Sequence, residues 1–226
     1  NHYTYVFAGD GCLMEGLSHE ASSLAGHLKL NKLIVFFDNN SISIDGPTSL
    51  SISENITQRY EAYGWKVITI DGHDHIAVSN AITQAKQNNA PTLISCKTKI
   101  GYGSPNKESK SSSHGSPLGD EEITLTRKNL GWTDSPFEIP KSLLSQWRNF
   151  FLRNLKKKEE WFKNNKNTLN SQTFKNIFNH NLGNNIIDLI HKFKSKHIKE
   201  NTSCATRKAS ELAIELLNDQ LDNLIG

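Results

Sequence analysis

The sequence predicts a doubly wound α/β domain built on a mostly parallel sheet. Short apolar runs typical of buried strands alternate with runs typical of helices over roughly the first 100 residues. The first two predicted strands each end in polar residues, Gly9-Asp10-Gly11 and Asn39-Asn40. Twenty-seven residues separate these two groups. This βαβ spacing brings the carboxyl ends of both strands to one edge of the sheet, where ligands bind.

The expected elements follow from the periodicity of apolar residues. Strands are expected at residues 3–8, 33–37, 64–70 and 92–97, and helices at 13–30, 55–63 and 76–87. The strand at 3–8 is expected to be buried. The first helix is expected to bury a stripe formed by Leu13, Leu17, Ala21, Leu24, Ala25 and Leu28. Asp74 is placed to cap the helix that begins near His75, so the histidine-rich loop 71–75 needs no metal to explain it.

The chain changes character after the fourth strand. Residues 101–119 are rich in Gly, Ser and Pro, which is typical of a lid or binding loop, although disorder would give the same composition. Helices are expected at 120–130, 141–165 and 205–224, and a helical connection between two domains is expected through about residue 199. Aromatic residues beside lysines in 141–165 favour core packing with a solvated face over RNA binding.

The two strand ends carry the chemistry of a magnesium diphosphate site. Asp10 offers an anionic oxygen and Asn40 a neutral one, which are the ligand types that Mg²⁺ prefers. Gly9 and Gly11 would let the backbone approach a diphosphate, and the N–H groups of the following helix would point at the same anion. Each half alone is a common turn sequence, so the pairing at βαβ spacing is what favours a site over two unrelated turns.

Composition excludes several classes of protein. The chain has 226 residues and a net charge of +3, too small and too localised to indicate nucleic acid binding. Its three cysteines are far apart and indicate neither a disulfide framework nor a zinc site, which fits a reducing cytoplasm. No run has the length of a membrane span and no signal peptide is visible. Because the chain starts without Met and stops just after a helix, it is interpreted as a fragment.

Longer sequence segments around these motifs resemble those of the transketolases, enzymes that depend on thiamine diphosphate (ThDP). Seven sequence motifs occur in the same order as in that family, at residues 7–16, 20–30, 42–46, 59–65, 100–104, 114–119 and 205–210. The resemblance covers most of the chain and is weakest across roughly residues 145–200. It implies the ThDP-binding fold, with a diphosphate-binding domain at 1–135, a helical linker at 136–200 and the start of a pyrimidine-binding domain at 201–226.

The resemblance also implies roles for individual residues. The cofactor set would be Gly9, Asp10, Gly11, Asn40, Ile42, Ile100 and His114. Asp10, the Asn40 side chain and the Ile42 backbone carbonyl would hold Mg²⁺, for which Ca²⁺ or Mn²⁺ could substitute. Ile100 would pack near the thiazolium ring, and His114 would touch both the diphosphate and the substrate. Glu15 would relay protons at the interface of a homodimer, and Arg207 would bind the phosphate of a sugar substrate. Without the resemblance, Glu15 is explained as an acid that the helix dipole favours in the first turn, and Arg207 as a surface charge.

The expected function is transfer of a two-carbon ketol unit from a ketose phosphate to an aldose phosphate, in the pentose phosphate pathway of the cytoplasm. The family residue that activates the cofactor, and several of its histidines, have no counterpart in this chain, so the fragment alone is expected to be inactive. The alternatives are a related ThDP enzyme, such as dihydroxyacetone synthase or a deoxyxylulose phosphate synthase, and a non-catalytic or incomplete ThDP-binding subunit. No nucleic acid or membrane partner is expected.

Overall fold

The computed structural model describes residues 2–178, 184–221 and 224, which divide into two compact units, Asn1–Ser135 and Pro136–Gly226. The first unit is built on a four-stranded sheet in the order β1-β2-β6-β5. Its strands are β1 (Thr4–Gly9), β2 (Leu33–Asn39), β5 (Lys66–Asp71) and β6 (Thr92–Lys97), and all three pairings are parallel. The predicted α/β fold with a parallel sheet is confirmed.

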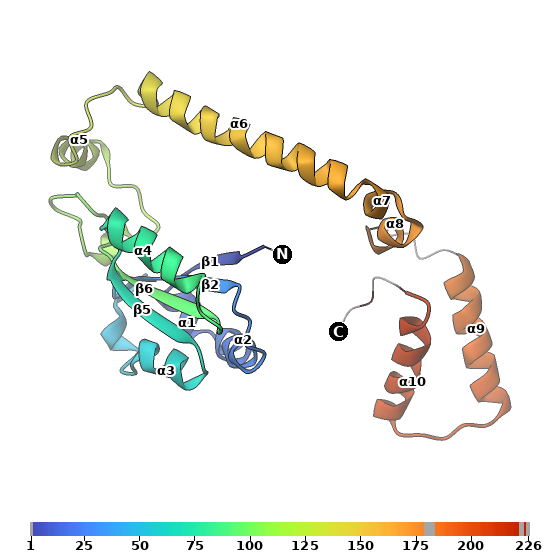
Figure 1. The fold of residues 1–226 in the computed structure, drawn as a ribbon. Helices are drawn as coiled ribbons and strands as arrows, with labels where there is room; N and C mark the ends of the chain where they lie inside the picture. The colour runs from blue at the N-terminus through green and yellow to red at the C-terminus, as the bar shows by residue number, and fades with distance from the viewer. Residues whose placement is uncertain (1, 179–183, 222–223, 225–226) are drawn as a thin grey trace. The chain divides into compact units, whose positions relative to one another are not determined.

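Helices cover both faces of the sheet (Figure 1). One face packs against α1 (Asp10–Met14), α2 (Gly16–His27) and α3 (Ile56–Ala62), with a core that includes Leu13, Ala25 and Tyr60. The other face packs against α4 (His75–Ala85), through Ala81 and Ala85. Successive residues of β2 alternate between these two cores, as the period of a strand requires.

Local capping explains where two of these helices begin. The Asn55 side chain accepts a hydrogen bond from the backbone N–H of Gln58 at 3.2 Å, at the start of α3. Asp74 Oδ1 accepts from the N–H groups of Ile76 and Ala77 at 2.8 and 3.2 Å. The expected capping role of Asp74 is therefore confirmed, and it satisfies two of the backbone donors that every helix start leaves unpaired.

The first helix differs from the prediction in its limits and in its buried face. The chain is helical from Asp10 but breaks at Glu15, where ψ is 137°, so two helices replace the single one expected at 13–30. Leu17, Leu24 and Leu28 are exposed, and α2 instead buries Ser22, Ala25 and Gly26. The packing is tightest at Gly26, where a Cβ would collide with the backbone carbonyl of Tyr63.

The first strand is also less buried than expected. β1 lies at the edge of the sheet, and Phe7 is 81% exposed although it stacks on Phe36 at a ring distance of 5.1 Å. The central strands β2 and β6 carry the buried residues Ile34, Phe37, Leu93 and Ile94. Apolar composition alone does not separate an edge strand from a central one, because both are rich in the same residue types.

Two short stretches lie beyond the strand ends of the first unit. The loop after β2 forms a small antiparallel pair, β3 (Ile42–Ser43) and β4 (Gly46–Pro47), followed by the 3₁₀ turn η1 (Thr48–Leu50). The segment after β6 contains the 3₁₀ turn η2 (Ser111–Ser113) and leads into α5 (Asp120–Asn129). This last helix was expected at 120–130.

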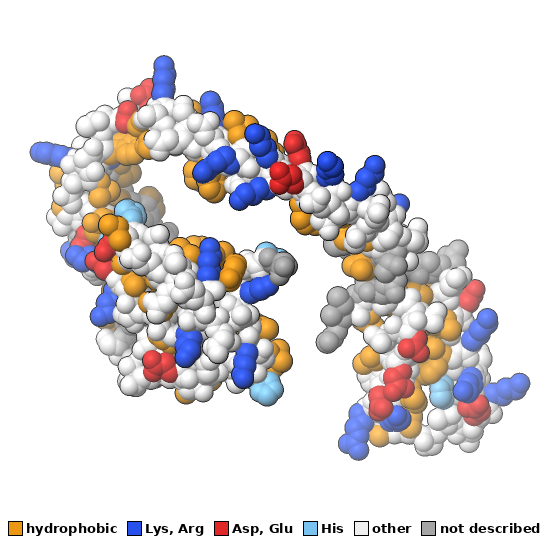
Figure 2. All heavy atoms as spheres, in the orientation of Figure 1, with side chains coloured by type: hydrophobic (Ala, Val, Ile, Leu, Met, Phe, Trp, Pro, Cys, Tyr) orange, Lys and Arg blue, Asp and Glu red, His pale blue; other side chains and the backbone are white. Residues whose placement is uncertain are grey.

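The second unit is helical in its described residues. It contains α6 (Lys141–Asn164), α7 (Lys166–Asn170), α8 (Gln172–Phe178), α9 (Asn184–Lys199) and α10 (Thr206–Asn218). Residues 179–183 of the expected connection, and 222–223 of the expected last helix, lie outside the described residues. Figure 2 shows basic and apolar side chains side by side along α6. Among the described helices of the chain, none combines the length and apolar character needed to cross a membrane.

Candidate functional site

A cavity of about 860 Å³ lies at the carboxyl edge of the sheet, where the ends of β1, β2, β5 and β6 meet. The parallel register explains why these ends coincide, since Gly9 pairs with Asp38 and Asp38 pairs with Cys96. The residues expected to bind cofactor all line this cavity: Gly9, Asp10, Gly11, Asn40, Ile42, Ile100 and His114. The structure therefore brings together residues that lie more than 100 positions apart, and their individual roles stay predictions.

Asp10 has a buried carboxyl oxygen without a protein partner. The residue is 6% exposed, and its Oδ2 atom makes no hydrogen bond to any described residue. Burial raises the pKa of Asp10, while hydrogen bonds from backbone amides, including those of Asn40 and Ser41, oppose this shift. A buried carboxylate oxygen without a donor is unfavourable unless something supplies positive charge. A divalent cation bound at Oδ2 would do so, and this atom fits the expected Mg²⁺ site.

The neighbouring carboxylate, Asp38, is already occupied by protein groups. The Thr98 hydroxyl donates a hydrogen bond to its Oδ1 atom, and the Asn40 amide donates to Oδ2 at 3.4 Å. The Asn40 Oδ1 atom accepts from the backbone N–H of Ile42 at 2.9 Å, which closes the turn after β2. Asp38 thereby orients Asn40, and its negative charge contributes to the raised pKa of Asp10. Both carboxyl oxygens of Asp38 therefore have protein partners, whereas Asp10 Oδ2 has none among the described residues.

The two glycines beside Asp10 face open space. A Cβ atom added to Gly9 or Gly11 would meet no protein atom within 4 Å. Packing inside the protein therefore gives no reason for glycine at either position. Glycine there lets an incoming group reach the backbone N–H groups, as the expected diphosphate would require.

The loop that carries His114 is ordered by its own polar contacts. The Lys107 ammonium group donates to the Leu118 carbonyl at 2.8 Å, and Ser113 Oγ donates to the Lys107 carbonyl at 2.6 Å. The buried Glu122 carboxylate accepts from Ser104 Oγ and from the Asn106 backbone and side-chain N–H groups at 2.8 and 2.9 Å. These contacts favour a structured binding loop over disorder for residues 101–119.

Some cavity residues have no role in the predicted site. Asp38, His73, Thr98 and Lys99 also line the cavity. The His73 ring stacks on Tyr102 at 3.9 Å, and its Nε2 atom accepts from the Lys99 backbone N–H at 3.1 Å. The position of His73 directly after a strand was the available signal, because every strand end of a parallel sheet points to this edge. The Asp74 cap explains where the helix begins, but it does not predict that His73 lines the cavity.

Two predicted site residues do not line the cavity. Glu15 lies at the break between α1 and α2, is exposed, and accepts backbone hydrogen bonds at its carbonyl from Ser18 and His19. Arg207 is exposed in the first turn of α10, in the second unit. Their expected roles, at a dimer interface and at a substrate phosphate, stay predictions.

Comparison with known proteins identifies relatives over the whole chain. A family profile described as the thiamine diphosphate binding domain of transketolase matches residues 1–181. The transketolase of Sinorhizobium medicae (strain WSM419) is 44% identical over 230 residues, which cover 100% of this chain and 32% of the relative. This chain spans about a third of the length of that relative and of similar curated proteins from Buchnera aphidicola.

Solved structures give the same result for the fold. The crystal structure of transketolase from Campylobacter jejuni superimposes with a TM-score of 0.70 at 36% identity, covering 80% of this chain and 29% of that one. The transketolase of Pichia stipitis, in complex with sedoheptulose-7-phosphate, superimposes with a TM-score of 0.69 at 40% identity, covering 72% of this chain and 25% of that one.

Proposed function

Because this chain belongs to the transketolase family, we propose that it supplies the magnesium diphosphate anchor of an enzyme that moves a two-carbon ketol unit from a ketose phosphate to an aldose phosphate. The family profile supports ThDP as the cofactor. The observation that carries the proposal is the unpartnered, buried Oδ2 atom of Asp10, in a cavity that is lined by every expected cofactor residue of the chain.

Asp10, Asn40 and the Ile42 carbonyl would hold the cation, with Mg²⁺ as the natural ion and Ca²⁺ or Mn²⁺ as substitutes. One carboxylate with neutral oxygens is the donor set that Mg²⁺ accepts when phosphate oxygens complete its coordination. Among the described residues, no three His, Cys, Asp or Glu side chains are grouped as a metal site.

When bound, ThDP would supply the chemistry of bond breaking. The protein would bind the diphosphate at Gly9 and Gly11 and place the apolar side chain of Ile100 against the ring. His114 would donate a hydrogen bond to the diphosphate or to a substrate oxygen, as an imidazole at a cavity wall can. These residues would contribute positioning and hydrogen bonding.

The remaining roles lie outside the described cavity. We propose that Glu15 relays protons at a homodimer interface, and that Arg207 binds the phosphate of the sugar, since a guanidinium group matches phosphate geometry. Residues 136–200 would act as the linker and 201–226 as the start of the pyrimidine-binding domain. A cytoplasmic enzyme of the pentose phosphate pathway fits these roles. The names of the relatives favour this function over dihydroxyacetone synthase and over a non-catalytic subunit.

The test is Asp10→Asn in the complete enzyme. We expect the variant to lose Mg²⁺-dependent ThDP binding, measured by calorimetry, together with ketol transfer. Asp120→Asn is the matched control, because Asp120 is an exposed carboxylate at the start of α5 and should change neither. Unchanged turnover of Asp10→Asn at saturating cofactor would contradict the proposed site.

A further inference from the structure

The helix that begins at Asp10 is too short to hold itself in place. α1 has five residues and ends where the backbone of Glu15 becomes extended. Its last carbonyl groups therefore have no partner in a following turn. A helix of this length is also unstable alone, because nucleation is unfavourable and few hydrogen bonds follow it. Something outside α1 must fix its position, and with it the position of Asp10.

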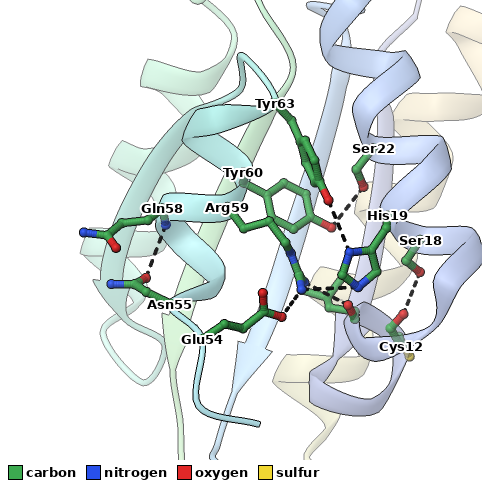
Figure 3. Close-up of polar contacts among 11 residues, drawn as sticks. Cys12, Ser18, His19, Ser22, Glu54, Asn55, Gln58, Arg59, Tyr60 and Tyr63 are labelled. Atoms are coloured by element: carbon green, nitrogen blue, oxygen red, sulfur yellow. Dashed lines mark hydrogen bonds and ion pairs between the residues drawn. The ribbon is translucent and has the colours of Figure 1, made fainter.

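Two side chains from other helices donate hydrogen bonds to these carbonyl groups. Ser18 Oγ, from α2, donates to the Cys12 carbonyl at 2.6 Å (Figure 3). An Arg59 guanidinium nitrogen, from α3, donates to the Leu13 carbonyl at 2.8 Å. Arg59 reaches across 46 positions in sequence to make this contact. It also places a positive charge at the negative end of α1, where a cation is favourable.

The same guanidinium group binds two further partners. Its other terminal nitrogen pairs with the Glu54 carboxylate and lies 3.3 Å from His19 Nε2. Because a guanidinium group can only donate, His19 Nε2 is the acceptor in this contact. The other ring nitrogen of His19, Nδ1, lies 3.2 Å from the Tyr63 hydroxyl oxygen. The Arg59 side chain is 11% exposed, so water screens its contacts with Leu13 and His19 little, whereas the Glu54 side chain is 41% exposed and its pair with Arg59 is screened more.

Two of these partners belong to the segments that carry the predicted cation ligands. Leu13 lies on the helix of Asp10, and Glu54 lies in the loop that follows Asn40 and Ile42, before α3. Arg59 itself does not line the cavity. We propose that Arg59 is a positioning residue, which holds the α1 helix and the segment ending at Glu54 in the arrangement that binds the cation. This inference rests on the proposed function.

The position of Asp10 matters because cation ligands must be held within about 0.5 Å of their productive geometry. Without Arg59, the Leu13 carbonyl loses its partner, and α1 keeps the Ser18 contact, its buried Leu13 side chain and the backbone amide hydrogen bonds to the Asp10 carboxylate. Lysine at position 59 keeps the charge. A single ammonium group, however, cannot reproduce the fork that reaches Leu13, Glu54 and His19 together.

The experiment compares Arg59→Met and Arg59→Lys with the wild type in the complete enzyme. Two quantities are measured: the dissociation constant for Mg²⁺ at fixed ThDP, and hydrogen exchange of the α1 backbone amides without cofactor. Asp74→Ala is the control, because it removes a cap from α4 on the opposite face of the sheet. It should destabilise the protein and leave both measurements unchanged.

We expect Arg59→Met to weaken Mg²⁺ binding and to speed α1 exchange, each by at least about tenfold, the loss that one charge-assisted hydrogen bond implies. Arg59→Lys should fall between Met and the wild type. The inference is overturned if Arg59→Met stays within about twofold of the wild type in both measurements, or if Asp74→Ala causes the same changes. Should Arg59→Met not fold, wild-type values for Arg59→Lys would overturn it.

The experiment distinguishes failure of the proposed function from failure of the Arg59 inference. If the wild-type enzyme shows no Mg²⁺-dependent ThDP binding, the magnesium diphosphate site is wrong. The exchange rates of α1 in the wild type and in the Arg59 variants would then still decide whether Arg59 holds this helix.

Discussion

The Asp10 carboxyl group is buried in a place where a charge is unfavourable. Its pKa is raised above the ordinary value of 3.8, first by burial and also by the charge of Asp38. The folded protein therefore binds this proton more tightly than the unfolded chain does. Stability associated with Asp10 is present below pH 3.8 and is lost as the pH rises through the raised pKa. Without a cation, the ionised carboxylate destabilises the fold at neutral pH.

Asp10→Asn should therefore raise the thermal midpoint of the metal-free protein at pH 7, because an unpartnered amide is less unfavourable in a buried place than an unpartnered charge. The difference from the wild type should shrink as the pH falls toward 3.8. Mg²⁺ with ThDP should stabilise only the wild type, as a ligand of the folded state does. Thermal unfolding in EDTA and in Mg²⁺ at several pH values checks this. A lower midpoint for the variant in EDTA at pH 7 would contradict it.

At the scale of elements, Glu122 fixes the loop that carries His114 to α5. The Ser104 hydroxyl, the Asn106 backbone N–H and the Asn106 amide lower the pKa of Glu122 from 4.5 to about 2. The folded pKa lies below the unfolded one, so the stabilisation is present above about pH 4.5 and is lost as the pH falls toward 2. Ionised Glu122 thus orders the loop across the neutral range.

Glu122→Gln should loosen residues 101–119 at pH 7, because the amide keeps one acceptor oxygen and loses the charge that strengthens its hydrogen bonds. Limited proteolysis within the loop should become faster by on the order of tenfold. Glu121→Gln is the matched control, since Glu121 is the exposed neighbour on the same helix turn. Equal cleavage rates in Glu122→Gln and the wild type would show that the loop is ordered by other contacts.

The contact between α2 and the chain after α3 requires a glycine. A Cβ at Gly26 would collide with the Tyr63 carbonyl oxygen and come within 3.2 Å of Trp65. Gly26→Ala should therefore lower the free energy of unfolding by about 1–3 kcal/mol, the usual range for overpacking. Gly16→Ala, in the first turn of the same helix, meets no atom within 4 Å and should be neutral or stabilising. Urea unfolding of both variants tests this, and equal stability would contradict the close packing.

The break at Glu15 shows what periodicity in the sequence cannot predict. Apolar residues from Leu13 to Leu28 have helical spacing, which is why one helix with a leucine stripe was expected. At the break, Arg59 and Ser18 donate hydrogen bonds to carbonyl groups of α1. On the buried face, the Tyr63 backbone approaches Gly26 closely. The contacts of Arg59 and Tyr63 are long-range, and a local pattern carries no information about them.

At the scale of the whole molecule, the sheet and its cavity were more predictable than their surroundings. Short apolar runs that end in Gly9-Asp10-Gly11 and Asn39-Asn40 specify both the strands and the edge where they end. Burial depends on which strand takes the edge position, so the exposure of Phe7 was not predictable from its own neighbours. His73 was missed because its loop was explained by the Asp74 cap, although its position just after a strand placed it at the same edge.

The two compact units of this chain differ in what stabilises them. Both apolar clusters of the sheet lie in the first unit, and they include the buried side chain of Trp65. In the described part of the second unit, Ile186 is the one buried apolar residue, and Trp147 and Trp161 are 75% and 52% exposed. Helices gain most of their stability from packing of an apolar face, so those of the second unit should be the weaker ones.

We therefore expect this 226-residue chain to unfold in two steps on heating. Circular dichroism at the helical band should fall first, as the second unit melts over a broad range. Fluorescence of a Trp147→Phe, Trp161→Phe variant, in which Trp65 and Trp132 remain, should report the later cooperative transition of the first unit. The sheet supplies that cooperativity, because strands β2 and β6 each contribute residues to both cores. Coincident transitions by both methods would mean that the units unfold as one body, and that the second unit is stabilised as strongly as the first.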